Sequence, residues 1–218
     1  MLKKIMYLLS AIVSVLLVLA SMRQWISLSM PEVLAFITGG LTVWLTVKEN
    51  IWNWPIGIAN SVFFVVLFWQ ARLFADMGLQ VVYIILGFLG WYWWLFGGKN
   101  KTTLKVSKTT KTEIALATII TIVATYGLTI YLKSIQDSAP FLDALTTVMS
   151  LVAQYLLTKK RIENWFIWIS VDVIYIGLYF YKHLYLTSIL YLIFMIMCFA
   201  GLAEWRKSER NSNAIQEI

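Results

Sequence analysis

The chain has 218 residues, of which 60% are hydrophobic and only 13% are charged, and its mean hydropathy is +0.75. A soluble domain carries about twice that charged fraction, so the composition excludes a water-soluble globular protein and predicts an integral membrane protein. The net charge of +7 does not indicate nucleic-acid binding, because the basic residues stand in short loops between apolar stretches. The single cysteine, Cys198, lies in an apolar run, which excludes an intrachain disulfide and predicts a buried, inert thiol.

Apolar stretches of similar length follow one another along the whole chain. Most have about 16 to 24 residues, the length that a helix needs to cross some 30 Å of hydrocarbon. None alternates with period two, as the strands of a membrane barrel do. The sequence therefore predicts an all-α integral membrane protein with about eight spans, at 5–22, 32–47, 53–70, 73–96, 113–132, 141–157, 164–181 and 184–203.

The N-terminal segment 1–30 holds the span that fits the others least. Lys3 and Lys4 followed by an apolar run are also typical of a signal peptide, which is the alternative interpretation. No small-x-small cleavage site precedes Arg23, so a retained helix is favoured. At the other end, the polar segment 207–218 is predicted to be a disordered cytoplasmic tail.

Shifted by 111 residues, the chain resembles itself. Between Leu45 and Trp94 no gap is needed, and roughly 14 of about 50 positions are identical, which indicates an internal repeat. We predict two three-helix copies, 31–98 and 139–206, separated by a basic loop and linker helix in 99–138. Three crossings reverse the direction of the chain and the linker span restores it, so the copies run parallel. The clearest matches are Asn53-Trp54 with Asn164-Trp165, Gly90 with Gly201, and Trp94 with Trp205.

Lysine and arginine alternate between rich and poor loops. The positive-inside rule places the rich loops, and therefore both termini, in the cytoplasm of a multi-pass cell (inner or plasma) membrane protein. The rich loops hold Lys3, Lys4, Lys48, Lys99, Lys101, Lys105, Lys108, Lys111, Lys159, Lys160, Arg161, Arg206, Lys207 and Arg210, whereas the others hold Arg23, Arg72, Lys133 and Lys182.

One carboxylate stands well inside a predicted span. An ionisable group in hydrocarbon faces the bundle interior and is a functional hypothesis by default. Trp165, Trp168 and Asp172 share one helix face, because they are three and four residues apart. Trp rings attract delocalised cations and a carboxylate strengthens that attraction, so this face predicts a site for an aromatic cation. The alternatives are a structural role for Asp172 and an interfacial anchor for the two Trp residues.

Uncharged polar side chains also fall inside the spans. Asn60 is central in 53–70, and Gln80 and Tyr83 share a face of 73–96; the repeat matches Gln80 with Tyr191. Amides donate and accept hydrogen bonds, which suits hydroxyl and carboxamide groups, although helix–helix contacts are the simpler interpretation.

Asp143 opens the first helix of the second copy. A carboxylate there stabilises the helix N-terminus, and Asp143 is also deep enough to line an outer cavity. The chain has no nucleotide-binding Gly-x-x-x-x-Gly-Lys-Ser/Thr loop, no His-Glu-x-x-His and no Cys cluster, and it has one His. The sequence therefore predicts no enzyme activity, no cofactor and no metal.

Five short segments stand in a characteristic order and spacing across the two copies. They are Gly57-Ile-Ala-Asn60, Leu73-Phe-Ala-Asp-Met-Gly-Leu-Gln80, Gly90-Trp-Tyr-Trp-Trp94, Pro140-Phe-Leu-Asp143 and Glu163-Asn-Trp-Phe-Ile-Trp168. In the order and spacing of these segments the chain resembles the PnuC family of vitamin transporters, and the resemblance covers about residues 30–206.

The resemblance implies a fold like the SWEET sugar transporters and facilitated uptake of nicotinamide riboside, which has a cationic ring, a carboxamide and a ribose. Trp165 and Trp168 would hold the ring, and Asn60, Gln80, Asp143 and Tyr191 would contact its polar groups. It also implies lipid contacts, a possible homotrimer, and a cytoplasmic kinase that traps the substrate.

The chain departs from the family pattern at Asp172, where some members have Asn. A carboxylate favours nicotinamide riboside or thiamine, both cationic, over neutral riboflavin. Thiamine or another vitamin in the same scaffold is therefore the main alternative substrate. A sugar carrier and a non-transporting membrane subunit that binds a partner are further alternatives.

Overall fold

The computed structural model describes residues 30–70, 74–136, 139–181, 183 and 185–216. In these residues the regular structure is helical, and the one β-bridge joins Ser107 to Arg161. The predicted span 5–22 lies outside the described residues. The α-helices are α2 (Met30–Val47), α3 (Asn53–Gln70), α4 (Phe74–Phe96), α5 (Lys111–Ser134), α6 (Pro140–Thr158), α7 (Asn164–Tyr181) and α8 (Tyr185–Gln216).

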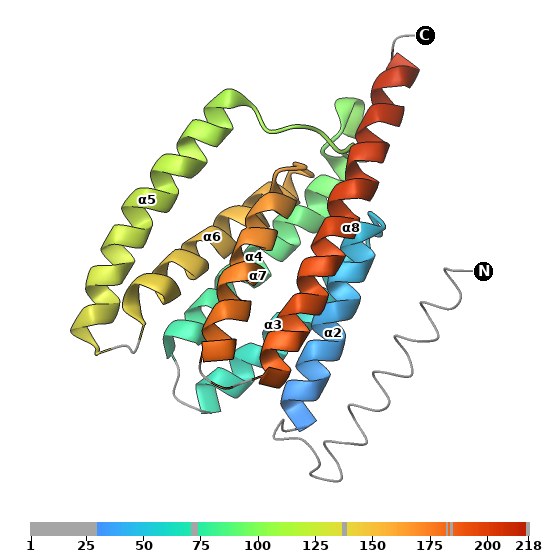
Figure 1. Cartoon of the computed structure of the whole chain (residues 1–218). Helices are drawn as coiled ribbons and strands as arrows, with labels where there is room; N and C mark the ends of the chain where they lie inside the picture. Colours follow the sequence, from blue (N-terminus) through green and yellow to red (C-terminus); the bar gives the residue numbers. More distant parts are fainter. Residues whose placement is uncertain (1–29, 71–73, 137–138, 182, 184, 217–218) are drawn as a thin grey trace.

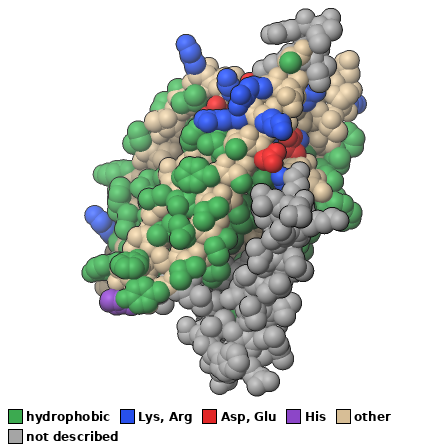
Figure 2. Space-filling model, turned by 45° about the vertical axis from the view of Figure 1, so that its right-hand side comes forward, with side chains coloured by type: hydrophobic (Ala, Val, Ile, Leu, Met, Phe, Trp, Pro, Cys, Tyr) green, Lys and Arg blue, Asp and Glu red, His purple; other side chains and the backbone are tan. Residues whose placement is uncertain are grey.

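Five of the described helices are long and apolar enough to cross a membrane. They contain Met77–Phe96, Lys111–Ser134, Pro140–Thr158, Asn164–Tyr181 and Thr187–Ser212, and α2 has a shorter apolar part at Ile37–Val47. Hydrophobic side chains cover much of the molecular surface, and most of the visible Lys and Arg side chains gather near one end (Figure 2). This distribution is that of a multi-pass membrane protein.

The helices form two groups of three, with α5 on the outside. In the first group α3 packs against α2 and α4, and in the second α7 packs against α6 and α8. The groups meet where α2 contacts α8 and where α4 contacts α6. Helix α5 joins the groups and packs along α6 at the edge of the molecule (Figure 1).

The polar C-terminal segment is helical, so the prediction of a disordered tail is wrong as far as Gln216. Helix α8 extends well beyond Arg206, as the upper end of the red helix shows in Figure 1. Lys, Glu, Arg and Gln have high helix propensity, so a helix that is already nucleated in the membrane continues through them. Glu209 Oε1 also lies 3.9 Å from Lys108 Nζ, which ties this extension to the loop before α5.

Four buried tryptophans, here called the tryptophan cluster, form the core at the end where α2 and α6 finish. Trp54 and Trp94 meet edge to face with ring centroids 5.3 Å apart, and Trp165 and Trp205 do the same at 5.3 Å. Trp94 and Trp205 join the two pairs at 5.9 Å. Aromatic contacts are favourable beyond the area they bury. The two edge-to-face pairs lie within one group each, so the tilted Trp94–Trp205 contact is the one that joins the two groups of helices.

Two glycines allow the indoles to pack this closely. A Cβ on Gly90 would lie 2.2 Å from Trp54 Cη2, and a Cβ on Gly201 would lie 2.4 Å from Trp165 Cζ2. Both positions are inside helices, where glycine weakens the helix. The close approach of a rigid ring explains why glycine stands at both positions.

The tryptophan cluster also makes two reciprocal hydrogen bonds between the groups. Trp94 Nε1 donates to the Leu157 carbonyl and Trp205 Nε1 donates to the Thr46 carbonyl, both at 3.1 Å and both buried. Each residue of the second bond stands 111 positions from its counterpart in the first. The contact of α4 with α6 is therefore repeated by the contact of α8 with α2.

An ion pair connects the loops that follow α2 and α6. Lys160 Nζ lies 2.9 Å from Glu49 Oε2, and the two residues are themselves 111 positions apart. Both have positive φ, 52° at Glu49 and 50° at Lys160, so the two loops turn in the same way. The Lys160 side chain is only 8% exposed, which limits the screening of this pair by solvent.

Two further loop lysines contact the opposite group. Lys48 Nζ lies 2.9 Å from Glu204 Oε1, and Lys159 Nζ lies 3.4 Å from the centre of the Trp93 ring. These contacts again involve positions separated by 111. Partial burial lowers the pKa of Lys159, and the nearby Arg161 lowers that pKa further.

Candidate functional site

A cavity of about 440 Å³ lies between the two groups of helices. It extends from the middle of the bundle to the tryptophan cluster and receives side chains from every described α-helix except α5. Its lining consists of Gly39, Thr42, Val43, Thr46, Asn53, Trp54, Gly57, Ile58, Asn60, Ser61, Phe64, Leu79, Gln80, Tyr83, Gly87, Ser150, Gln154, Leu157, Asn164, Trp165, Trp168, Val171, Asp172, Tyr175, Tyr191, Phe194 and Cys198.

Seven of the eight site residues predicted from the sequence line this cavity. They are Asn60, Gln80, Tyr83, Trp165, Trp168, Asp172 and Tyr191. Asp143 is not among the lining residues and stands in the first turn of α6, where its carboxylate favours the helix N-terminus. The structure therefore brings together residues from four helices and leaves Asp143 apart.

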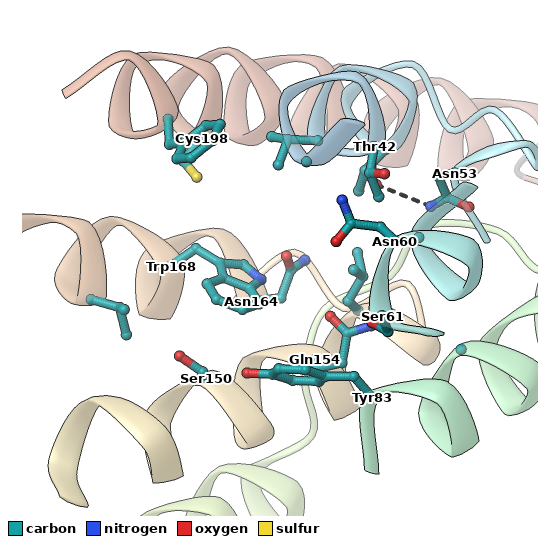
Figure 3. A pocket seen from close by; sticks show the side chains of 18 of the residues that line it. Thr42, Asn53, Asn60, Ser61, Tyr83, Ser150, Gln154, Asn164, Trp168 and Cys198 are labelled. Carbon is teal, nitrogen blue, oxygen red and sulfur yellow. Dashed lines mark hydrogen bonds between the residues drawn. The ribbon is translucent and has the colours of Figure 1, made fainter. Parts of the chain in front are cut away.

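One wall of the cavity, formed by α7 and α8, carries the charge. Trp168 projects into the cavity from α7 (Figure 3), and Asp172 follows one helical turn later. Asp172 is 5% exposed, and the Cys198 thiol of α8 donates to its Oδ2 at 3.6 Å. A thiol is a weak donor, so this hydrogen bond compensates little of the negative charge of the buried carboxylate. Such a carboxylate attracts a cation from the cavity.

Tyrosines continue this wall beyond Asp172. The Tyr175 and Tyr191 rings lie 4.8 Å apart between centroids, and Phe194 meets Tyr191 at 5.9 Å with perpendicular planes. All three residues line the cavity. Together with Trp168 they form an aromatic surface next to a carboxylate, which is the arrangement that binds delocalised cations.

The opposite wall, formed by α3 and α4, is polar and uncharged. Asn60 and Ser61 project from α3 toward the cavity (Figure 3), and Asn60 Nδ2 donates to the Thr38 hydroxyl of α2. Tyr83 of α4 is hydrogen-bonded to Ser150 of α6. The amide, hydroxyl and phenol groups of this wall match a ligand that carries hydroxyl or carboxamide groups.

The floor of the cavity consists of two identical dipeptides, Asn53-Trp54 and Asn164-Trp165. All four side chains are at most 3% exposed. Asn53 Nδ2 donates to Thr46 Oγ1 at 3.0 Å, and Asn164 Nδ2 donates to the Arg161 carbonyl at 2.5 Å. Among the described residues, the indole N–H groups of Trp54 and Trp165 have no hydrogen-bond partner. Trp165 and Trp168 both line the cavity; Trp165 is 2% exposed, and Trp168 projects into the cavity one turn later (Figure 3).

Sequence reasoning missed several polar lining residues. Ser61, Ser150 and Tyr175 line the cavity but are ordinary residues for a membrane helix, and Gln154 lines it as well. Cys198 is buried, as predicted, and its thiol contacts Asp172 in the cavity lining; its inertness stays a prediction. The repeat held one useful signal, since Ser61 stands 111 positions before Asp172.

The lining follows the same spacing throughout. Each lining residue of α6, α7 and α8 has the residue 111 positions earlier on the other side of the lining. The cavity is thus built from matched positions of two similar groups of helices. It can enclose one small ligand with a cationic aromatic part against α7 and α8 and a polar part against α3 and α4.

Comparison with known proteins identifies the family. The family model described as nicotinamide mononucleotide transporter matches residues 29–207. The chain belongs to the PnuC family of membrane transporters. It is 29% identical over 216 residues to the nicotinamide riboside transporter PnuC of Escherichia coli (strain K12), covering 86% of this chain and 90% of that protein. The family is one of transporters rather than enzymes, as the sequence predicts.

Other relatives show the range of the family. The chain is 27% identical over 188 residues to the riboflavin/roseoflavin transporter RibM of Streptomyces davaonensis, covering 83% of this chain and 87% of that protein. The crystal structure of the vitamin B3 transporter PnuC superposes with a TM-score of 0.72 at 23% identity, covering 96% of this chain and 92% of that one. This last likeness shows that the two proteins share a fold.

Proposed function

We propose that this PnuC-family protein takes up nicotinamide riboside by facilitated diffusion. The observation that carries the proposal is the division of one cavity between an aromatic wall with the Asp172 carboxylate and an uncharged wall of amides and hydroxyls. Nicotinamide riboside has the same division, with a cationic ring at one end and a ribose at the other. The similarity to the Escherichia coli nicotinamide riboside transporter supports the same substrate.

The site residues divide between the two ends of the ligand. Trp168 contacts the face of the ring and Asp172 supplies the counter-charge, while Tyr191 closes the aromatic wall. Asn60, Gln80 and Tyr83 hydrogen-bond the carboxamide and the ribose. Trp165 lies beside Trp168 at the floor of the cavity, and Asp143 stands in the first turn of α6, where a carboxylate stabilises the helix N-terminus.

The mechanism rests on two parallel three-helix repeats, 31–98 and 139–206, joined by the linker helix α5. We propose that the repeats rock about the axis between them and expose the cavity to each side in turn. The reciprocal bonds of Trp94 and Trp205 support this symmetry. The tryptophan cluster closes the end of the cavity next to the basic loops, which the positive-inside rule places in the cytoplasm with both termini.

The direction of net transport is set by a process outside this chain. A cytoplasmic kinase that phosphorylates the vitamin would trap it, because the product no longer fits a site with a carboxylate. A homotrimer in the lipid bilayer is the assembly we propose from family resemblance. Neither proposal affects the chemistry of the cavity within one chain.

Thiamine is the second candidate substrate, favoured by one observation. Thiamine also carries a cationic aromatic ring, and Asp172 suits either ligand. Riboflavin, the substrate named for the Streptomyces relative, is neutral, so a carboxylate gives it no counter-charge. The charge of the substrate is therefore the property that the site predicts most directly.

Titration calorimetry on purified protein tests the proposal. Nicotinamide riboside should bind, and Asp172→Asn should weaken that binding about tenfold, which corresponds to about 1.4 kcal/mol. Asp143→Asn is the matched control, because it removes a carboxylate of α6 that is not among the lining residues of the cavity. Binding of thiamine alone would assign the protein to thiamine, and equal affinity of wild type and Asp172→Asn would remove Asp172 from the site.

A further inference from the structure

Matched positions of the cavity lining are identical near the floor and differ above it. At the floor Asn53-Trp54 faces Asn164-Trp165, and their side chains are buried in the same way. One turn above, Gly57 occupies the position that corresponds to Trp168. An exchange of the smallest side chain for the largest is the greatest difference in volume between the two walls.

A second matched pair compensates for this exchange. A Cβ on Gly57 would lie 3.2 Å from Thr42 Cγ2, so the Thr42 methyl fills the space beside Gly57. The residue that corresponds to Thr42 in the second group is Ala153, which is completely buried. The larger residue, Thr42, lies beside glycine in the first group, and the matched positions of the second group hold the smaller Ala153 and the large indole of Trp168.

The position of Gly57 relative to Trp168 follows from the architecture of the cavity. Trp168 projects from α7, and Asn60 and Ser61, which follow Gly57 on α3, project from the facing wall (Figure 3). Gly57 lines the cavity one turn before Asn60 and Ser61 on the same face of α3, and a Cβ there would meet the Thr42 methyl. Glycine therefore adds no side chain to this wall at the position where α7 carries the indole.

We propose that Gly57 is a specificity-determining residue, because it leaves the slot in which the aromatic ring of the substrate lies against Trp168. This inference rests on the proposed function and adds the orientation of the ligand. The ring lies between the Trp168 indole and the bare backbone of α3 at Gly57. The hydroxyl-bearing end then points to Asn60 and Ser61, because Asp172 corresponds to Ser61 and the charge is present in one wall only.

The decisive variant gives the first wall the side chains of the second. Gly57→Trp combined with Thr42→Ala reproduces the Trp168 and Ala153 arrangement, so the helix contact has a precedent in the same protein. The milder variant is Gly57→Ala in a Thr42→Ser background, where removal of the Thr42 methyl relieves the 3.2 Å contact. Gly177→Ala, whose Cβ would meet nothing within 4 Å, is the control for adding a methyl group to a membrane helix.

Binding of nicotinamide riboside and thermal stability are measured for each purified variant. We expect the double Gly57→Trp variant to lose binding at least a hundredfold and the double Gly57→Ala variant to lose about tenfold, at wild-type melting temperature. Gly177→Ala alone should bind as wild type does, and Thr42→Ser alone, whose side chain also lines the cavity, is the reference for the Gly57→Ala pair. Unchanged or tighter binding in the Gly57→Trp variant would overturn the proposal.

If the Gly57→Trp variant fails to fold, the Gly57→Ala pair decides. Retained affinity in Gly57→Ala with Thr42→Ser, together with weak binding in Gly57→Ala alone, would show that Gly57 serves only helix packing and would refute the slot. A wild-type protein that binds no nicotinamide riboside would instead refute the proposed function. The two failures are therefore distinct.

Discussion

Removal of the two reciprocal indole hydrogen bonds should open the closed end of the cavity. Trp94→Phe and Trp205→Phe each keep an aromatic ring in the tryptophan cluster but delete one donor. Trp94 then no longer reaches the Leu157 carbonyl, and Trp205 no longer reaches the Thr46 carbonyl. Both bonds join the two groups of helices, so their loss weakens only the closed arrangement.

The magnitude follows from the partners that the carbonyls retain. The Leu157 carbonyl still accepts from the Lys160 N–H at 3.0 Å, and the Thr46 carbonyl still accepts from the Glu49 N–H at 3.0 Å. Neither oxygen becomes an unsatisfied buried acceptor, so each variant loses a net hydrogen bond of about 1 kcal/mol. That is about fivefold in the equilibrium between closed and open states. The two variants should be similar, because their contacts are equivalent.

The single cysteine of the chain provides the assay. Cys198 lines the cavity but is only 4% exposed, so a membrane-impermeant methanethiosulfonate reagent should reach it only when the cavity opens to the side on which the reagent is added. In inside-out vesicles each variant should be labelled about fivefold faster than wild type. Trp52→Phe is the matched control, because Trp52 is 64% exposed at the same end of the molecule. Cys198→Ala should abolish labelling.

The side from which labelling increases decides the outcome. Faster labelling only in right-side-out vesicles would place the closed end on the outer side and reverse the orientation. Wild-type labelling rates from both sides, in variants that remain folded, would show that the reciprocal bonds do not hold the cavity closed. Either result refutes the reasoning.

Three further outcomes follow from the same contacts. Gly90→Ala should lower stability by about 1–3 kcal/mol, because its Cβ would meet the rigid Trp54 ring at 2.2 Å, and a melting curve compared with Gly177→Ala checks this. Glu49→Gln should raise the rate at which Cys198 is labelled from the cytoplasmic side. The exchange Glu49→Lys with Lys160→Glu should return that rate to the wild-type value. A rate that stays high in the exchange variant would mean that the 2.9 Å ion pair is incidental. Cys198→Ala should leave nicotinamide riboside affinity within about threefold of wild type, since a thiol donates weakly; a larger loss in calorimetry would assign the thiol a direct role.

The helices could be predicted closely from the sequence, because hydrocarbon imposes one length and one polarity on every span. The predicted spans 53–70 and 164–181 coincide with α3 and α7. The end of α8 could not be found in this way, because beyond Arg206 the sequence is polar and apolar patterning gives no signal. There helix propensity and the contact of Glu209 with Lys108 decide the structure.

The candidate site was predicted from residues whose side chains are energetically costly to place in a membrane, such as the Asp172 carboxylate. Ser61 and Ser150 carry no such cost, because a hydroxyl can bond to its own helix, so their place in the cavity depends on packing alone. Asp143 was predicted from its place at the start of a helix and from the family resemblance; it is not among the lining residues, and its role in the site stays a prediction. The roles of Gly57 and Thr42 become visible only when the repeat is compared with the packing.

Uptake of radiolabelled nicotinamide riboside into proteoliposomes that contain only this protein tests the central claim most directly. We predict saturable uptake that stops when inner and outer concentrations are equal, and that is about tenfold weaker in apparent affinity for Asp172→Asn than for Asp143→Asn. Entry of thiamine or riboflavin in place of nicotinamide riboside, or the absence of saturable uptake in protein shown to be folded, would contradict the account.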